Sequence, residues 1–206
     1  MNGNDLAFPR AEIREIYKSE NRPWVVGYSG GKDSTTAMQL IWTALADLPR
    51  AERRKPVYGI SSDTLVETPV ISRYIDVSLE RIAAASIEQG MPFDPHKVVP
   101  DVDRSFWVNL LGRGYPAPSR KFRWCTKRLK IERANEFSKR RVAEFGEVVM
   151  VLGVRSQESA TLAQVMSLHS IEGSRLSRRS SLLNVFVYAP IAHFLTDEVW
   201  TYLLQE

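Results

Sequence analysis

Short apolar runs along this chain alternate with longer stretches in which apolar residues recur at helical spacing. The apolar runs predict β-strands at residues 24–28, 57–61, 97–99, 147–152 and 185–188. Helical spacing predicts α-helices at residues 33–46, 67–89, 103–111, 125–145, 157–168 and 196–205. Residues 91–95 (MPFDP) have the composition of a turn, and residues 171–183, rich in Ser and Arg, that of a mobile loop.

Strands that alternate with helices predict an α/β fold, a doubly wound and mostly parallel sheet with helices on both faces. In such sheets ligands bind at the carboxyl ends of the strands, beside the point where the strand order reverses. We expect residues 1–20 to be a lead segment and residues 21–206 to form one domain.

Composition places the chain among ordinary globular proteins, with 44% hydrophobic and 25% charged residues. No apolar run approaches the roughly 20 residues that span a bilayer, and the N-terminus has no secretory signal pattern. We therefore expect a cytoplasmic protein without a membrane partner. The single cysteine, Cys125, excludes an internal disulfide and a metal site built from this chain's cysteines alone.

Positive charge is concentrated in one part of the chain. Residues 104–141 contain twelve Lys or Arg against two acidic residues, although the whole chain carries a net charge of only +4. A smaller cluster follows at Arg175, Arg178 and Arg179. These residues form either a solvated helix face or the binding surface for a polyanion such as DNA.

The sequence SGGKDST at residues 29–35 follows the first apolar run directly. Only three residues separate Gly27 from the pair Gly31-Lys32, and an aspartate follows the lysine, so the segment is not a Walker A loop. It also lacks the GxGxxG spacing of a dinucleotide-binding turn.

The same segment has the properties of an anion cradle. Gly30 and Gly31 allow backbone N–H groups to turn inward, the following helix adds its positive end, and Lys32 adds a full charge. Ser29 and Ser34 offer hydroxyl groups to phosphate oxygens. Asp33 would repel a phosphate unless a cation lay between them, which favours Mg²⁺ at this position. The alternative is a plain turn followed by a capped helix.

The string SGGKDS resembles the PP-loop of the ATP pyrophosphatase superfamily, whose members cleave ATP between the α- and β-phosphates. This resemblance implies that the glycine corner holds the departing β- and γ-phosphates. It implies catalytic roles for Lys32 and Asp33 and ATP contacts from the loop residues Ser29, Gly30, Gly31, Lys32, Asp33 and Ser34.

Three further strings resemble segments of the phosphoadenylylsulfate reductases within that superfamily. SSDTLVETP (61–69) implies a ribose contact for Asp63, although Asp63 and Glu67 could instead cap the next helix. RWCTKRLKI (123–131) implies a functional Cys125, whose basic neighbours at the start of a helix favour the thiolate. LGVRSQES (152–159) implies ATP contacts from Gly153 and Arg155, with Arg155 holding an oxyanion. Leu162 stands where these enzymes often carry another arginine.

Residues 20–205 as a whole resemble the DndC-type sulfurtransferase subunits of DNA phosphorothioation systems. That resemblance implies ATP-driven replacement of a backbone phosphate oxygen by sulfur, with a cysteine desulfurase and other phosphorothioation subunits as partners. It implies DNA or phosphate contacts from Arg123, Lys127, Arg128, Lys130, Arg175, Arg178 and Arg179. It also implies a 4Fe–4S cluster for which Cys125 would be one ligand, and which one cysteine cannot complete. Either the chain is a truncated domain or this member works without the cluster, and we expect truncation.

Two other functions remain open at this stage. One is sulfonucleotide reduction of the phosphoadenylylsulfate reductase type. The other is a nucleotide-gated DNA-binding or assembly subunit without chemistry of its own.

Overall fold

Five parallel strands form the centre of the fold, in a computed structural model that describes residues 7–119, 121–158, 176–178 and 182–205. They are β1 (Trp24–Gly27), β2 (Val57–Ser62), β3 (Phe93–Val98), β4 (Val148–Val151) and β6 (Val185–Tyr188). The sheet order is β3-β2-β1-β4-β6-β5, in which the two-residue strand β5 (Ser177–Arg178) is antiparallel to β6. The predicted doubly wound, mostly parallel α/β fold is confirmed.

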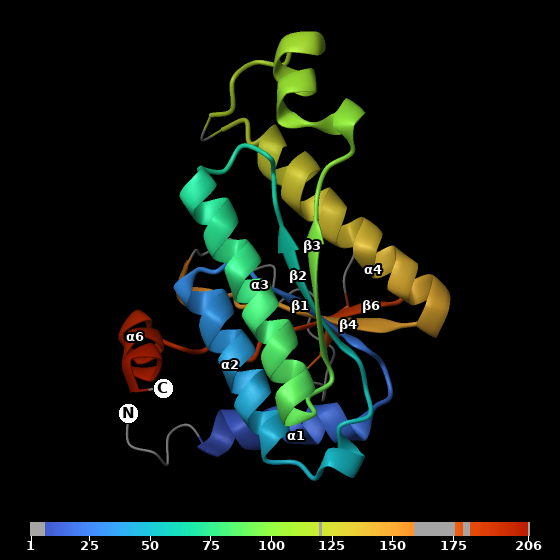
Figure 1. Ribbon diagram of the computed structural model, residues 1–206, viewed down its shortest axis with the longest axis vertical. Helices are drawn as coiled ribbons and strands as arrows, with labels where there is room; N and C mark the ends of the chain where they lie inside the picture. Colours follow the sequence, from blue (N-terminus) through green and yellow to red (C-terminus); the bar gives the residue numbers. More distant parts are fainter. Residues whose placement is uncertain (1–6, 120, 159–175, 179–181, 206) are drawn as a thin grey trace.

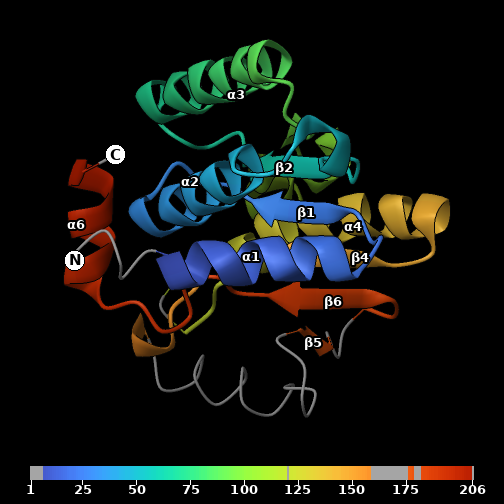
Figure 2. The ribbon, with the colours of Figure 1, turned by 90° about the horizontal axis from the view of Figure 1, so that it is seen from below.

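Helices cover both faces of this sheet (Figures 1 and 2). On one face Trp24 and Val26 of β1 pack in a core with α1 (Ala7–Ser19), α2 (Lys32–Ala46), α3 (Pro69–Gln89) and α6 (Thr196–Gln205). The intervening residue Val25 points to the other face, where it packs with Phe137 of α4 (Glu132–Phe145). Both faces of β1 are apolar because side chains alternate along a strand and both sides are covered.

The strand order reverses beside β1. The chain passes from β1 to β2 and then to β3 on one side, and returns through α4 to β4 on the other side of β1. The carboxyl ends of β1 and β4 therefore flank the switch point, where open α/β sheets bind their ligands.

The prediction was wrong about where the third strand begins. Residues 91–95 read as a turn, but β3 starts at Phe93, and Pro95 pairs with Gly59 of β2. Proline is tolerated there because β3 pairs with β2 alone and lies at the edge of the sheet, where one row of N–H groups needs no partner.

Residues 99–119 and 121–123 project beyond the carboxyl ends of β2 and β3 (Figure 1). The helix predicted at 103–111 is irregular, with a 3₁₀ turn at Val102–Arg104 and a π-helical turn at Val108–Gly112. The helix predicted at 125–145 is present, but its first part, Thr126–Ile131, is also π-helical.

The first described helix, α1, lies within the segment predicted to lead into the domain. Its residues Ile13, Ile16 and Tyr17 are buried in the same core as α2 and β1. The helix predicted at 157–168 falls almost entirely outside the described residues. Part of the loop predicted at 171–183 is described, and there Ser177–Arg178 form strand β5 instead. Within the described ranges, no helix is long and apolar enough to cross a membrane.

Candidate functional site

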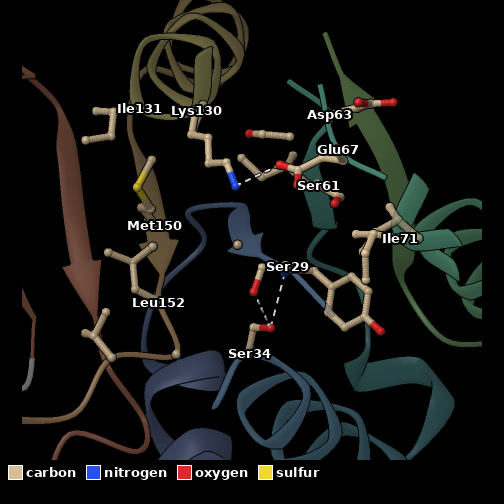
Figure 3. A pocket seen from close by; sticks show the side chains of 18 of the residues that line it. Ser29, Ser34, Ser61, Asp63, Glu67, Ile71, Lys130, Ile131, Met150 and Leu152 are labelled. Atoms are coloured by element: carbon tan, nitrogen blue, oxygen red, sulfur yellow. Dashed lines mark hydrogen bonds and ion pairs between the residues drawn. The ribbon is translucent and has the colours of Figure 1, made fainter. Parts of the chain in front are cut away.

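The glycine corner joins the carboxyl end of β1 to the N-terminus of α2, at the switch point. Gly30 has a φ of +71°, and a Cβ atom there would lie 2.7 Å from Cε1 of Tyr74. A side chain is therefore excluded both by the backbone conformation and by the close approach of α3. The hydroxyl groups of Ser29 and Ser34 lie 3.0 Å apart, which holds the corner closed (Figure 3).

The N-terminus of α2 is open to a ligand. Gly31 is the N-cap residue, and no side chain caps the helix there. The capped-helix alternative for SGGKDS therefore does not describe this corner. The first N–H groups of a helix need an acceptor, and an anion at this position would supply one.

Asp33 occupies the first turn of α2 between two cations. Its Oδ2 accepts a hydrogen bond from Nζ of Lys32 at 2.7 Å, and its Oδ1 accepts one from Nε of Arg155 at 2.7 Å. Burial acts to raise the pKa of Asp33, but the hydrogen bonds and charges of Lys32 and Arg155 outweigh it and lower the pKa below its ordinary value. Asp33 is thus held as a carboxylate.

Arg155 follows β4 and emerges at the same sheet edge as the glycine corner, as the sequence predicted. Its side chain is nearly buried, with 5% of its surface exposed. Its Nε donates to Asp33, and its Nη1 donates a second hydrogen bond to Oγ1 of Thr196 at 3.0 Å. Arg155 therefore ties the start of α2 to the start of α6, and its role as an oxyanion clamp stays a prediction.

Gly153 lets the chain after β4 pass directly against the glycine corner. A Cβ atom at this position would lie 2.6 Å from the carbonyl oxygen of Asp33 and 2.8 Å from Cα of Ser34. Both of these are backbone atoms, which cannot rotate away as the end of a side chain could. Only glycine fits here, and the loop after β4 can therefore lie directly against the glycine corner.

A cavity of about 520 Å³ opens beside this corner, between β1, β2, α3, α4 and β4 (Figure 3). Four of the predicted ATP-binding residues line it: Ser29, Ser34, Asp63 and Gly153. Much of the remaining lining is apolar and comes from Ile60, Ile71, Ile75, Ile131, Ala134, Met150 and Leu152. A mainly apolar cavity with a few polar groups suits a flat heteroaromatic ring with a polar tail.

Sequence reasoning missed these apolar residues because they look like any other core residue of a strand or helix. Their spacing predicted burial, and burial alone does not reveal a cavity.

Two acidic residues after β2 face the rim of the cavity. Asp63 accepts a hydrogen bond from N of Leu65 at 2.9 Å and lies 3.6 Å from Nζ of Lys97. Glu67 accepts one from Oγ1 of Thr64 at 3.1 Å and forms an ion pair with Lys130 at 3.1 Å (Figure 3). Neither caps α3, whose N-cap residue is Thr68 without a side-chain cap. The helix-cap alternative for these residues was therefore wrong.

The other predicted contact residues lie near the start of the helix that leads into α4. Cys125 lies at the start of this helix, as predicted. Its side chain is half-buried and does not line the cavity. Arg123 and Lys127 are exposed, and Arg128 lies over the ring of Tyr115. Lys130, predicted as a DNA contact, lines the cavity instead of standing free. Arg175, Arg179 and Leu162 lie outside the described residues, as does the side chain of Arg178.

The residues present fit ATP and Mg²⁺ but not a complete iron–sulfur cluster. The open helix N-terminus suits a triphosphate, and Asp33 could contribute the one carboxylate that Mg²⁺ often takes from protein beside phosphate oxygens. Over the described ranges, no three His, Cys, Asp or Glu side chains gather as a metal site. One cysteine cannot supply the four thiolates of a 4Fe–4S cluster.

Known structures of low sequence identity share this fold. A phosphoadenylyl-sulfate reductase from Candida auris, solved as a phosphate complex, is 14% identical with a TM-score of 0.53, over 96% of this chain and 78% of that one. The U34-tRNA thiolase NcsA from Methanococcus maripaludis, solved with its [4Fe-4S] cluster, is 16% identical with a TM-score of 0.57, over 97% and 63%. An FMN adenylyltransferase from Candida glabrata is 13% identical with a TM-score of 0.50, over 98% and 55%.

Among curated proteins, an uncharacterised protein of Methanocaldococcus jannaschii is 25% identical over 194 residues, which are 94% of this chain and 34% of that protein. The chain thus spans about a third of that relative's length. The family model of the phosphoadenosine phosphosulfate reductase domain matches residues 23–206. The glycine corner that resembles a PP-loop lies within these residues, and residues 29–34 are called the PP-loop below. The chain therefore belongs to the phosphoadenosine phosphosulfate reductase domain family.

Proposed function

We propose that this chain is an ATP pyrophosphatase that activates a DNA backbone phosphate for sulfur insertion. The observation that carries the nucleotide part is the continuity between the apolar cavity and the uncapped PP-loop at the switch point. The cavity receives the adenosine, and the PP-loop receives the β- and γ-phosphates at the positive end of α2.

The residues at the switch point support cleavage between the α- and β-phosphates. Pyrophosphate is the leaving group in that cleavage, and negative charge grows on it as the bond breaks. Backbone N–H groups at Gly30 and Gly31, with Lys32, stabilise that charge because they are fixed before the reaction begins. Bound Mg²⁺ would neutralise phosphate charge, and Oδ2 of Asp33 would hold it once Nζ of Lys32 leaves that oxygen for the phosphates.

The activation step forms a bond between an oxygen of the DNA phosphate and the α-phosphorus of ATP, and pyrophosphate departs. A sulfur nucleophile then bonds to the activated phosphorus and AMP departs. Where the donor is a persulfide made by a cysteine desulfurase, a second thiol reduces the S–S bond and releases the phosphorothioate. Cys125 is the one sulfur nucleophile that the sequence provides, and other phosphorothioation subunits would complete the assembly.

The DNA part rests on the basic residues and on the resemblance of the sequence to DndC-type subunits. Arg123 and Lys127 are exposed at the start of the helix leading into α4. Exposed cations that neutralise phosphates give affinity that falls with salt.

The deciding experiment incubates the chain with α-labelled ATP and Mg²⁺, with and without DNA, and separates the products. AMP with pyrophosphate supports the proposal, whereas ADP with phosphate contradicts it. Lys32→Ala should remove turnover, and Arg123→Ala with Lys127→Ala should weaken DNA binding and reduce its salt dependence without changing ATP affinity.

A second candidate is sulfonucleotide reduction, which the family match favours. It predicts that phosphoadenylylsulfate binds more tightly than ATP and that a thiol reductant releases sulfite from it. The third candidate, a nucleotide-gated assembly subunit, predicts ATP binding with neither product. A titration that compares the affinities for ATP and phosphoadenylylsulfate, together with an assay of the products, therefore separates the three candidate functions.

A further inference from the structure

We propose that the projection formed by residues 99–119 and 121–123 binds an unpaired stretch of the polynucleotide by stacking a base on Trp107. This inference rests on the polynucleotide partner of the proposed function and goes beyond it by naming the form of nucleic acid. It is carried by a ladder of aromatic rings and by the charge around them.

The aromatic ladder runs from the interior to the surface of the projection. Trp124 is buried, and its ring stacks on Phe106 with centroids 5.3 Å apart and planes at 18°. Phe106 in turn meets Trp107 edge to face at 5.2 Å. Trp107 is 56% exposed, so a large aromatic ring faces solvent while its neighbours hold it in place.

Backbone contacts fix the turn that presents Trp107. Asn109 is fully buried, and its Nδ2 donates to the carbonyl oxygens of Arg104 and Ser105 at 3.0 and 2.8 Å. Its own carbonyl accepts from N of Tyr115 at 3.0 Å. The ring is thus pre-positioned, which reduces the entropy lost when a ligand binds.

The charge around this ring matches a polyanion. Residues 104–131 contain eight Lys or Arg and no Asp or Glu. Arg113, Lys121 and Arg123 are exposed together with Phe122, which is 47% exposed. Arg104 is half-exposed and lies 3.6 Å from Glu136 of α4. Aromatic rings among cations are the composition of surfaces that bind single-stranded nucleic acid, whereas the centres of protein interfaces are poor in lysine.

An unpaired base is favoured over a duplex for a geometric reason. Within a duplex the faces of the bases are covered by their neighbours, so an exposed indole can stack only on a base that is single-stranded or turned out of the helix. The projection also leads directly to the nucleotide cavity. Trp124 precedes Lys130, which lines that cavity, by six residues of the same helical segment.

The test compares the affinity of a short fluorescein-labelled DNA strand with that of the same strand annealed to its complement. The wild-type chain should bind the single strand more tightly. Trp107→Ala should lower that affinity roughly 5- to 150-fold and change duplex affinity little. Trp107→Tyr should restore most of it, because an aromatic face remains.

The matched control is Trp200→Ala, which removes a tryptophan 49% exposed on α6, and this variant should bind both DNA forms like the wild type. If Trp107→Ala and the wild type bind the single strand with equal affinity, the inference is overturned. If these two proteins nevertheless bind the duplex, the proposed function stands. A wild-type chain that forms AMP and pyrophosphate but binds neither DNA form at low salt would overturn both the inference and the DNA part of the proposal.

Discussion

Arg155 donates its Nε–H to Oδ1 of Asp33 across 2.7 Å, joining two residues 122 positions apart in the sequence. Asp33 is 13% exposed and Arg155 5% exposed in their side chains. The pair lies at the base of the PP-loop, so the conformation of the loop depends on a residue that follows β4.

Replacing Arg155 should therefore destabilise the fold as well as the site. Arg155→Met leaves a nearly buried carboxylate with Lys32 alone, and removal of one partner of a buried pair costs about 3–5 kcal/mol. Urea denaturation followed by circular dichroism measures this loss. Lys32→Met is the matched control, since Lys32 is 28% exposed and its pair with Asp33 should contribute about 1 kcal/mol or less. Equal losses in the two variants would contradict this account.

The lowered pKa of Asp33 predicts a loss of stability in acid. The unfolded chain takes up a proton on Asp33 at a higher pH than the folded chain does. The stabilisation is therefore fully present above the ordinary aspartate pKa and is lost as the pH falls through the lower folded value. Asp33→Asn should show a shallower decline of the urea midpoint below about pH 4 than the wild type. If the urea midpoints of the wild type and of Asp33→Asn fell in parallel, the acid sensitivity would belong to other groups.

Gly153→Ala should disrupt the PP-loop, because the new methyl group meets the backbone of Asp33 and Ser34 below 3.0 Å. We expect a loss of about 1–3 kcal/mol in stability, or somewhat more because the clash is with backbone, and a loss of ATP affinity in the protein that remains folded. Gly112→Ala is the control, since its nearest neighbour would lie at an ordinary 3.8 Å. Isothermal titration with ATP and thermal unfolding measure both effects, and an unchanged ATP affinity would show that the two loops are independent.

Cys125→Ser should leave ATP binding unchanged, because Cys125 does not line the cavity. The same change should abolish sulfur incorporation into DNA in cells, whether the thiol carries sulfur or contributes to a cluster completed elsewhere. Nuclease digestion followed by mass spectrometry of dinucleotides measures that incorporation. Full incorporation by the variant would make Cys125 a packing residue.

Lys55 and Tyr17 predict a rise and then a fall of stability in alkaline solution. Burial lowers the pKa of Lys55 to about 8, despite the nearby Glu20. Between about pH 8 and 10.5, Lys55 therefore carries its proton in the unfolded chain but not in the folded chain, and the free energy of unfolding rises with pH. Burial raises the pKa of Tyr17 to about 12, so above pH 10 the unfolded chain loses a proton that the folded chain keeps, and stability falls. Lys55→Met should lack the rise, and Tyr17→Phe should lack this part of the fall. Chemical denaturation at several pH values tests both, and unchanged profiles in the variants would contradict the assignment.

Sequence patterns predicted the parallel sheet and the close turn at the glycine corner because both depend on local features. A strand buried on both faces is apolar along its length, and Gly30 with Gly31 identifies a close turn before a helix. The start of β3 was missed because Pro95 weighs against a strand, and only its place at the sheet edge makes it acceptable.

The candidate site was predictable only in its polar part. Ser29, Ser34, Asp63 and Gly153 were predicted from motifs, and the structure brings them around one cavity. The contact of Arg155 with Thr196 and the apolar wall of the cavity depend on how distant elements pack, which no local pattern records.

The π-helical turn at Thr126–Ile131 makes the register of this helix sensitive to chain length. A π turn holds one more residue than an α turn, and each residue of a helix rotates the chain by about 100°. Loss of one residue here would let the helix become regular and would turn Cys125 and Arg123 to a different side relative to α4. Deletion of one residue from 126–129 would therefore reorient the whole projection and leave Lys130 and Ile131, which line the nucleotide cavity, on the α4 side of the change. By this route related proteins would present different surfaces beside the same nucleotide cavity.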